Sequence, residues 1–305
     1  MKPRRDAASP TAPSAGPTPP PLASLEDQRI SLMELPDSLG PLRSVASGQV
    51  DGRPVLLVGA RSGVFLVDPE GKAPPAAYAD GGIASPRGFS AACVLGQRLW
   101  ACHGDGGVVG WDLGTTAAPA LAHRPAVLGG TTKVCCLQPL ETDRLIFANG
   151  PLLWTMDLAG SLQQLLRVEA DIAVILLSES LLIVVDKSGR VSRFSRQTLL
   201  PRGTDRPVGQ PIAAALLPWI DGHRLLLADE SGSLCCVGLE DQILTQYRSV
   251  YPGLRAVAAA ADVIAAISPD RHRLLLWHPW DGRHPVLDLY VLPKTKSRLA
   301  DVHIA

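Results

Sequence analysis

The sequence predicts an all-β fold built from a repeated unit of short strands. The clearest copy of the unit is Leu57–Asp68, which has the pattern of two strands joined by a tight turn at Ser62 and Gly63. The same twelve-residue frame recurs without a gap as Ala101–Asp112, Ile146–Asp157, Val184–Ser195, Leu227–Gly238 and Ile267–His278. Neighbouring copies start 38 to 45 residues apart. A period near forty that is built from short strands is typical of β-propeller blades.

Two positions of the frame are apolar in every copy. The eighth residues are Val64, Val108, Leu153, Val191, Leu234 and Leu274, and the eleventh are Val67, Trp111, Met156, Phe194, Val237 and Trp277. We expect Trp111 and Trp277 to occupy equivalent places in two blades, pointing inward between adjacent sheets.

Alternating apolar and polar residues, bounded by turn residues, predict six blades of up to four strands around these frames. The expected strands are Leu42–Ala46, Val55–Val58 and Val64–Asp68; Ser90–Val94, Arg98–His103, Val108–Leu113 and Ala117–Ala122; Lys133–Leu137, Arg144–Ala148, Leu152–Asp157 and Leu162–Val168; Ile172–Leu177, Leu181–Asp186 and Arg190–Phe194; Ile212–Leu217, Arg224–Ala228, Ser233–Val237 and Gln242–Tyr247; Leu254–Ala259, Val263–Ile267, Arg273–Trp277 and Val286–Leu292.

The two ends of the chain are expected to differ. Residues 1–26 are rich in Pro and Ala and predict a disordered tail, so the propeller domain is placed at 27–305. Arg29–Leu35 and Ala300–Ala305 have strand patterns outside the six blades, and they are assigned to an incomplete seventh blade. These two strands are expected to pair with each other, to add to the edges of flanking blades, or to be completed by a partner.

The charge balance argues against long-range attraction to nucleic acid or to an anionic membrane. The 305 residues include 29 Lys plus Arg and 29 Asp plus Glu, which gives a formal net charge of zero. Near-zero net charge also gives little protection against self-association, which suits a protein that is held by a protein partner.

The six cysteines predict reduced thiols in a reducing compartment, and we expect a cytoplasmic protein. Cys135–Cys136 and Cys235–Cys236 are adjacent pairs on expected strands, so their side chains are predicted to point to opposite faces. This spacing is poor for a disulfide framework or for a zinc site. The early segment lacks the apolar region of a secretory signal, and Ile172–Val185 is broken by Ser178–Ser180 into two strand-length pieces.

Three groups of polar residues were weighed as sites. His103 opens a Gly-rich turn that could cradle a phosphate, but a hairpin turn is favoured because neither a helix nor a Lys-Ser pair follows. Asp105, Asp186 and Asp229 lie in equivalent turns, where capping of each turn is favoured over Ca²⁺ binding. His272, His278 and His284 lie near three aspartates, and a solvated loop is favoured over zinc or general-base chemistry.

Four residues near the C-terminal half are candidates for an interaction surface: Trp219, Trp277, Trp280 and His278. Tryptophan is enriched at binding hot spots, although packing between blades explains these residues equally well. No serine-, cysteine- or metal-based catalytic set can be assembled from the sequence, so no catalytic residue, cofactor or metal is predicted.

The third strands resemble those of WD40 repeats. Val108-Val-Gly-Trp-Asp112 is similar to the WD40 strand that ends in Trp-Asp, and Leu152–Asp157 and Leu274–His278 are weaker versions. The turns at Asp186–Gly189 and Asp229–Gly232 match the family's turn before that strand. The Gly-His pair that starts each WD40 repeat is not evident here, so the resemblance implies a degenerate, WD40-like propeller. Degenerate propellers of this kind also occur in bacterial systems that pair a MoxR-type ATPase with a von Willebrand A protein.

These observations predict a non-catalytic propeller that serves as an interaction platform, as a subunit or scaffold of a multiprotein assembly. The resemblance adds an ATPase or a von Willebrand A protein as the candidate partner. The alternatives are a propeller enzyme, either a metal-dependent hydrolase or a quinoprotein-like oxidoreductase, and a ligand-sensing module. An enzyme needs carboxylates or a cofactor pocket that converge on the central channel.

Overall fold

The computed structural model describes residues 30–81, 87–103, 107–114, 121–123, 134–205, 211–219, 222–229, 233–239, 243–248, 256–260, 263–267, 271–277, 280–281 and 284–285. Within these ranges the chain is all-β, with a single 3₁₀ turn, η2 (Asp37–Leu39), between the first two strands. All paired strands among the described residues are antiparallel, as expected for short strands joined by tight turns.

The described strands form six four-stranded sheets, which we number in chain order. Sheet 1 is β2 (Leu42–Val50), β3 (Arg53–Ala60), β4 (Gly63–Val67) and β5 (Ala76–Ala79). Sheet 2 is β6 (Phe89–Leu95), β7 (Arg98–His103), β8 (Val108–Asp112) and β9 (Leu121–His123). Sheet 3 is β10 (Val134–Pro139), β11 (Arg144–Asn149), β12 (Leu152–Asp157) and β13 (Leu162–Arg167).

The second half repeats this plan. Sheet 4 is β14 (Ile172–Leu177), β15 (Leu181–Asp186), β16 (Val191–Ser195) and β17 (Pro201–Asp205). Sheet 5 is β18 (Pro211–Trp219), β19 (Gly222–Asp229), β20 (Ser233–Gly238) and β21 (Ile243–Arg248). Sheet 6 is β22 (Val257–Ala260), β23 (Val263–Ile267), β24 (Arg273–Trp277) and β1 (Ile30–Glu34), and β25 (Trp280–Asp281) pairs with β26 (His284–Pro285) separately.

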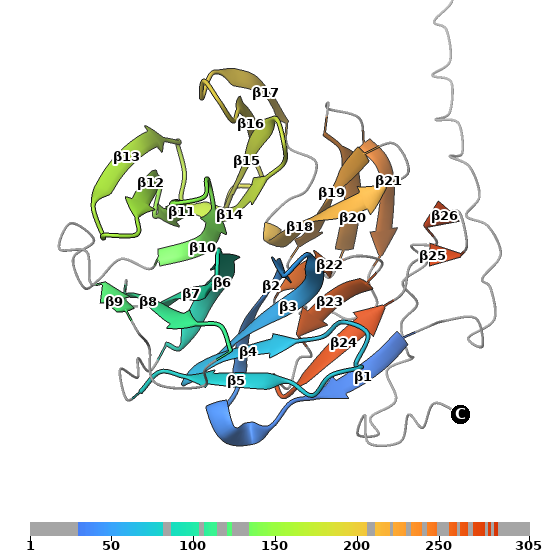
Figure 1. Cartoon of the computed structure of the whole chain (residues 1–305). Helices are drawn as coiled ribbons and strands as arrows, with labels where there is room; N and C mark the ends of the chain where they lie inside the picture. The colour runs from blue at the N-terminus through green and yellow to red at the C-terminus, as the bar shows by residue number, and fades with distance from the viewer. Residues whose placement is uncertain are drawn as a thin grey trace, which may run out of the picture.

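The sheets are arranged as a propeller-like ring (Figure 1). The first strand of each sheet contacts the first strand of the next, in the order β2, β6, β10, β14, β18 and β22, and β22 returns to contact β2. Apolar side chains fill the spaces between neighbouring sheets. One cluster, for example, joins Val55 and Val64 of sheet 1 to Leu99 and Trp111 of sheet 2.

The repeated frame corresponds to the hairpin between the second and third strands of each sheet. Its eighth residue is buried in the five copies whose side chains are described: Val64, Val108, Leu153, Val191 and Leu274. The turns differ in length, however, because Val64 pairs with Gly59, Val108 with Cys102 and Leu274 with Ile267. The frame therefore stays in register with the third strand in every copy. The position of the second strand within the frame differs from copy to copy, because the turns differ in length.

Trp111 lies where the sequence predicts, inward between two sheets. Its side chain is 1% exposed, and its Nε1–H donates a hydrogen bond of 2.8 Å to the Ala79 carbonyl of sheet 1. The ring meets Tyr78 edge-on and packs beside Phe89. The backbone of Trp277 ends the third strand of sheet 6, as expected, and its side chain lies outside the described residues.

The assignment of Arg29–Leu35 to a seventh blade is wrong. β1 pairs along its whole length with β24, from Ile30 opposite Trp277 to Glu34 opposite Arg273, and so becomes the outer strand of sheet 6 (Figure 1). This is the alternative in which an end strand adds to a flanking blade. β1 therefore occupies the edge of β24 to which the sequence had assigned Val286–Leu292. Val286–Leu292 and Ala300–Ala305 lie outside the described residues.

Two outer strands differ from the expected pattern. β17 was not predicted, since Pro201 and Gly203 are poor strand formers, yet the strand pairs with β16 through a register shift next to Pro201. β9 starts at Leu121, later than the expected Ala117. The broken segment Ile172–Val185 is confirmed as two strands, and the Leu181 N–H donates to the Ser178 hydroxyl in the turn between them.

The packing of Trp111 predicts a large effect of truncation. Trp111→Ala should lower the free energy of unfolding by about 3–5 kcal/mol, because the change leaves a cavity between sheets 1 and 2. Trp111→Phe retains most of the ring but loses the bond to Ala79, and should cost less. Urea denaturation measures both. Equal stability of Trp111→Ala and the wild type would contradict the packing described.

The closure of the ring by β1 predicts a sharp boundary for N-terminal truncation. Removing residues 1–26 should leave the melting temperature unchanged, whereas removing residues 1–34 should lower it and promote association through the exposed edge of β24. Thermal melting and light scattering measure the two effects. Two truncations with the same melting temperature would show that β1 is not needed for closure.

Candidate functional site

The antiparallel order gives the ring two faces with different connections. The hairpin face carries the turns after the first and third strands. There the Gln97 side chain of sheet 2 donates to Asp51 of sheet 1, and Arg196 reaches the Leu140 and Ser178 carbonyls. The crossover face carries the turns after the second strands and the starts of the first strands. There the backbone N–H of Leu42 donates to the carbonyl of Arg271, and the backbone N–H of Lys187 donates to the carbonyl of Asp171.

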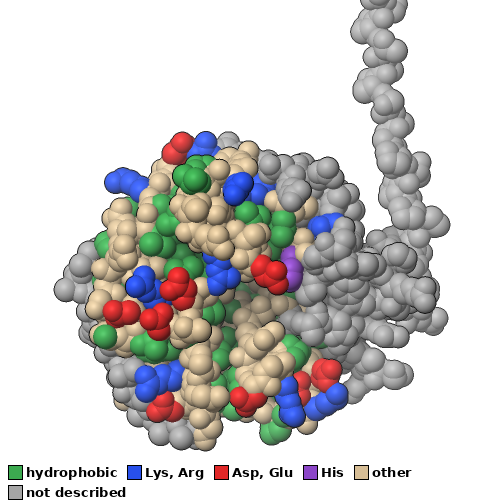
Figure 2. Space-filling model, turned by 45° about the horizontal axis from the view of Figure 1, so that its top comes forward, with side chains coloured by type: hydrophobic (Ala, Val, Ile, Leu, Met, Phe, Trp, Pro, Cys, Tyr) green, Lys and Arg blue, Asp and Glu red, His purple; other side chains and the backbone are tan. Residues whose placement is uncertain are grey.

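A cavity of about 270 Å³ lies at the centre of the ring and is lined by the first strands of all six sheets. Figure 2 shows the ring hollowed at its centre, with acidic and basic side chains interspersed around the hollow. Most of the lining side chains are small, including Ala46, Ala91, Ala173, Ala214 and Ala258. Six strands that converge on one axis leave little room for side chains, and small residues allow this approach.

Four of the six first strands carry a β-bulge near their starts. One extra residue interrupts the pairing of β2, β6, β14 and β18 with their second strands, at Arg43, Ser90, Ala173 and Ile212 respectively. In β10 the interruption comes later, between Cys135 and Gln138. A bulge bends its strand and changes the direction of its side chains. The bulge residues Arg43, Ser90 and Ala173 all line the cavity.

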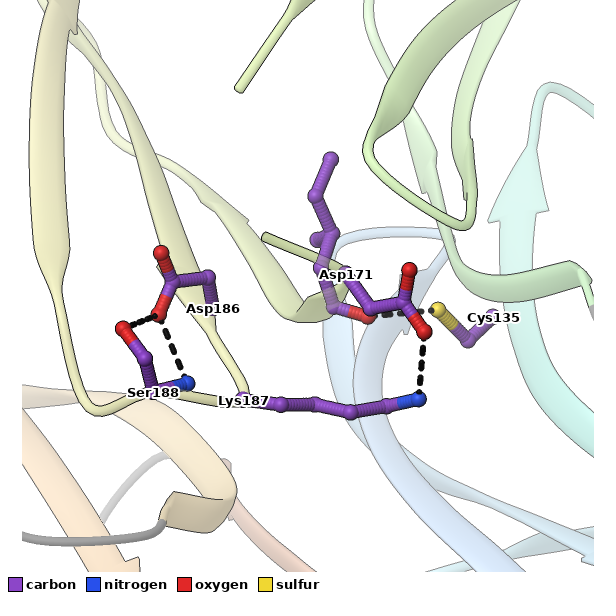
Figure 3. A network of polar contacts seen from close by, with 6 residues as sticks. Cys135, Asp171, Asp186, Lys187 and Ser188 are labelled. Carbon is purple, nitrogen blue, oxygen red and sulfur yellow. Dashed lines mark hydrogen bonds and ion pairs between the residues drawn. The ribbon is translucent and has the colours of Figure 1, made fainter. Parts of the chain in front are cut away.

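Hydrogen bonds from these bulges join neighbouring sheets around the cavity. The Ser44 hydroxyl donates to the Phe89 carbonyl at 3.2 Å, and the Ser90 hydroxyl donates to the Val134 carbonyl at 2.7 Å. The Cys135 thiol donates to the Ile172 carbonyl at 3.3 Å (Figure 3). Each acceptor is the first residue of the next sheet's first strand, so these three bonds form what we term the inter-sheet belt.

Cys136 departs from the expected strand geometry. Its φ of 59° is in the left-handed region, which few residues other than glycine adopt, and it lies in the bulge of β10. Its thiol donates to the Ala173 carbonyl at 2.9 Å, next to the acceptor used by Cys135. The prediction that these two side chains point to opposite faces is therefore wrong, because the bulge turns both toward β14.

The pKa of the Cys136 thiol is raised well above its ordinary value. The main cause is its hydrogen-bonding contact with the Cys135 thiol, followed by burial. Burial likewise raises the pKa of the Cys93 thiol, which lies between sheets 2 and 3. No disulfide links the four cysteines whose side chains are described.

Arg43 is the charged residue among those that line the cavity. Its Nε is buried, and no hydrogen-bond acceptor among the described residues reaches it. The side chain extends past Gly88 at the crossover face, because a Cβ at Gly88 would lie 3.2 Å from the Arg43 Cγ. An arginine in such a place presents a guanidinium to a carboxylate or phosphate that enters the cavity.

The acidic residues of the crossover face serve local structure. Asp186 is 3% exposed and accepts hydrogen bonds from the Ser188 N–H and the Ser188 hydroxyl (Figure 3). It also accepts a hydrogen bond from the Arg190 N–H. The prediction that Asp186 caps its own turn is confirmed. Asp171 pairs with Lys187 at 2.9 Å, and the Arg190 guanidinium lowers the pKa of Glu169. The side chains of Asp105 and Asp229 lie outside the described residues.

The histidines considered as candidate ligands, for which a hairpin turn and a solvated loop were favoured, lie apart in the described part of the chain. His103 is buried at the end of β7 with its ring against Phe89. Its backbone N–H donates to the Gly107 carbonyl at 2.7 Å and so closes the hairpin. His272 is exposed and lies 3.6 Å from the Asp37 carboxylate. His278 and the side chain of His284 are not described, and no group of three metal-ligating side chains forms among the described residues.

The backbones of two predicted surface tryptophans lie on the hairpin face. Trp219 ends β18 and Trp277 ends β24, and both strands run toward that face. Leu200, in the turn between β16 and β17, is 63% exposed and is the large apolar residue most open to solvent among those described. Trp280 lies in β25, and the side chains of all three tryptophans are outside the described residues.

The central cavity is not evident from the sequence. The sequence feature that accompanies it is the run of small residues in the first strands, such as Ala213–Ala215 and Ala256–Ala260, which by itself indicates only strands. Arg43 and Ser90 carry no motif of their own, and their shared position is visible only in the register of the sheets.

Comparisons with known proteins leave the family open. No family model matches the sequence, and no curated protein matches it. Among solved structures, the chain is similar to the computationally designed Ika8 protein, with 12% sequence identity and a TM-score of 0.49 over 78% of this chain and 70% of that one. In the described residues, no helix has the length and apolar character to cross a membrane.

The capping role of Asp186 predicts a measurable loss of stability. Asp186→Ala should cost about 2–3 kcal/mol, because a buried carboxylate that accepts three hydrogen bonds is removed and its donors lose their partner. Asp186→Asn retains one acceptor oxygen and should cost less. Chemical denaturation gives both values. If Asp186→Ala were as stable as the wild type, the turn would not depend on its cap.

Proposed function

We propose that this protein is a non-catalytic propeller that acts as an interaction platform within a multiprotein assembly. The observation that carries the proposal is the chemistry of the central cavity. The described residues that line it are alanines, serines, larger aliphatic residues, two cysteines, one glutamine and one arginine, without a carboxylate or an imidazole. A hydrolase or an oxidoreductase of this architecture uses converging acids or a cofactor pocket at that place.

The hairpin face is the surface that we propose for the partner. It presents Leu200 and the strand ends that carry Trp219 and Trp277, and these belong to the adjacent sheets 4, 5 and 6. An exposed apolar residue on the face where these tryptophan-bearing strands end suits a protein interface. Arg196 holds this region in place, because its guanidinium donates to the Leu140 carbonyl of sheet 3 and to the Ser178 carbonyl of sheet 4.

The test is the size of the protein in native extract. Wild-type protein at its natural level should elute from a sizing column in a complex larger than the monomer. Leu200→Asp and Trp219→Ala should shift it toward the monomer, since both alter the hairpin face. Lys187→Ala, an exposed change on the crossover face, is the matched control and should leave the complex intact.

Two results would contradict this proposal in different ways. A wild-type protein that elutes as a monomer would overturn the platform function. A complex that survives both hairpin-face variants but is lost with Lys187→Ala would move the partner to the crossover face. Cross-linking of the wild-type complex would then identify the partner, for which an ATPase or a von Willebrand A protein is the hypothesis. A cytoplasmic location is part of the same proposal.

A second candidate function, ligand sensing, is favoured by Arg43. A half-buried guanidinium at the wall of the central cavity suits an anionic ligand. Titration with inorganic phosphate, followed by thermal melting, should raise the melting temperature of the wild type and not that of Arg43→Gln. An equal response of both proteins would exclude Arg43 as the anchor.

A further inference from the structure

Adjacent cysteines in a regular strand cannot act together, because successive side chains point to opposite faces. In β10 the bulge between Cys135 and Gln138 and the left-handed φ of Cys136 remove this restriction. The two thiols donate to the consecutive carbonyls of Ile172 and Ala173, and they also contact each other. The backbone therefore holds two neighbouring sulfurs side by side.

Both cysteines also lie at the wall of the central cavity. Cys135 and Cys136 are each half-buried there. The other two described cysteines differ in this respect, since Cys93 is 2% exposed and Cys102 is completely buried between sheets 2 and 3. A reagent that enters the cavity therefore meets one pair of thiols among the described residues.

Cys136, at its left-handed position, adds a second hydrogen bond to β14, at the Ala173 carbonyl. In sheets 1 and 2 the inter-sheet belt uses a serine hydroxyl, and Cys135 occupies the corresponding place in sheet 3. The belt requires one donor, which Cys135 provides, so the second thiol at a left-handed position is additional. Backbone strain of this kind is a reason to look for a bound group.

We propose that Cys135 and Cys136 form a dithiol site that binds trivalent arsenic in the central cavity. Two neighbouring thiols chelate this element through two As–S bonds. With an arsenoxide, the As=O bond breaks, both thiol protons pass to the oxygen, and one water molecule leaves without any change in oxidation state.

The electrostatics of the cavity select among thiol-binding species. Arg43 is the charged residue among the described lining, and its guanidinium disfavours a metal cation. Trivalent arsenic is a neutral hydroxide or oxide at neutral pH and has no such penalty. A tetrahedral metal site is also not formed, because no three metal-ligating side chains gather among the described residues.

The test uses phenylarsine oxide on the full-length protein, followed by native mass spectrometry. The wild type should take up one equivalent, and peptide mapping should place it on Cys135 and Cys136. A dithiol such as 2,3-dimercaptopropanol should remove it, whereas a monothiol at the same thiol concentration should not. Loss of one sulfur removes the chelate and should weaken binding by ~10²-fold or more.

Two variants separate loss of the site from loss of the fold. Cys135→Ser keeps a donor for the Ile172 carbonyl, as Ser44 and Ser90 provide elsewhere, and should melt like the wild type while losing the adduct. Cys136→Gly suits the left-handed φ and should also fold without binding. The matched control is the double change Cys235→Ser and Cys236→Ser, an adjacent pair in β20 where the pairing runs regularly through both residues. This variant should keep the adduct.

Retention of the adduct by Cys135→Ser or Cys136→Gly at wild-type affinity would overturn the proposal, as would mapping of the arsenic to other cysteines. Loss of the adduct in the Cys235 and Cys236 control would do the same, because it would move the site to β20.

Discussion

The structure depends on one steric constraint, the convergence of six first strands on a common axis. Alanine and serine make up half of the residues that line the axis, because larger side chains would hold the strands apart. Backbone carbonyls at the starts of these strands then lie close to the neighbouring sheet, where Ser44, Ser90 and Cys135 donate to them. Close approach and the inter-sheet belt are therefore linked. The bulges that make the belt possible also direct Arg43 and the Cys136 thiol toward the cavity.

Closure of the ring follows from a second constraint, that a strand edge must be covered. Sheet 6 receives its outer strand from the other end of the described chain, because β1 pairs with β24. The seam is apolar: Leu39 and Leu42 near the start pack with Ile267 and Leu274 near the end in one cluster. The Leu42 N–H adds a bond to the Arg271 carbonyl. Burial of apolar surface between distant segments thus holds the two ends together.

Most of the ring could be predicted from sequence because local signals fix it. The frame places an apolar residue at each buried third strand, as Val64 and Val191 show, and turn residues mark each hairpin. Features that depend on distant pairing could not be predicted. The partner of Ile30–Glu34 is more than two hundred residues away, and no local pattern distinguishes an outer strand of sheet 6 from that of a further blade. The cavity could not be predicted for the same reason, since it forms from short segments of six separate strands.

The positions of Cys135 and Ser90 show how a structural role and a chemical role can share one place. Both donate to the first carbonyl of the next sheet, so either side chain satisfies the belt. A hydroxyl is the stronger donor and resists oxidation, so stability alone favours serine in β10 as in β6. Cys135 therefore gives a weaker hydrogen bond to Ile172 than a serine would. Cys136, whose φ is 59°, adds backbone strain. The chemistry of sulfur is therefore the property that distinguishes β10 from the first strands around it.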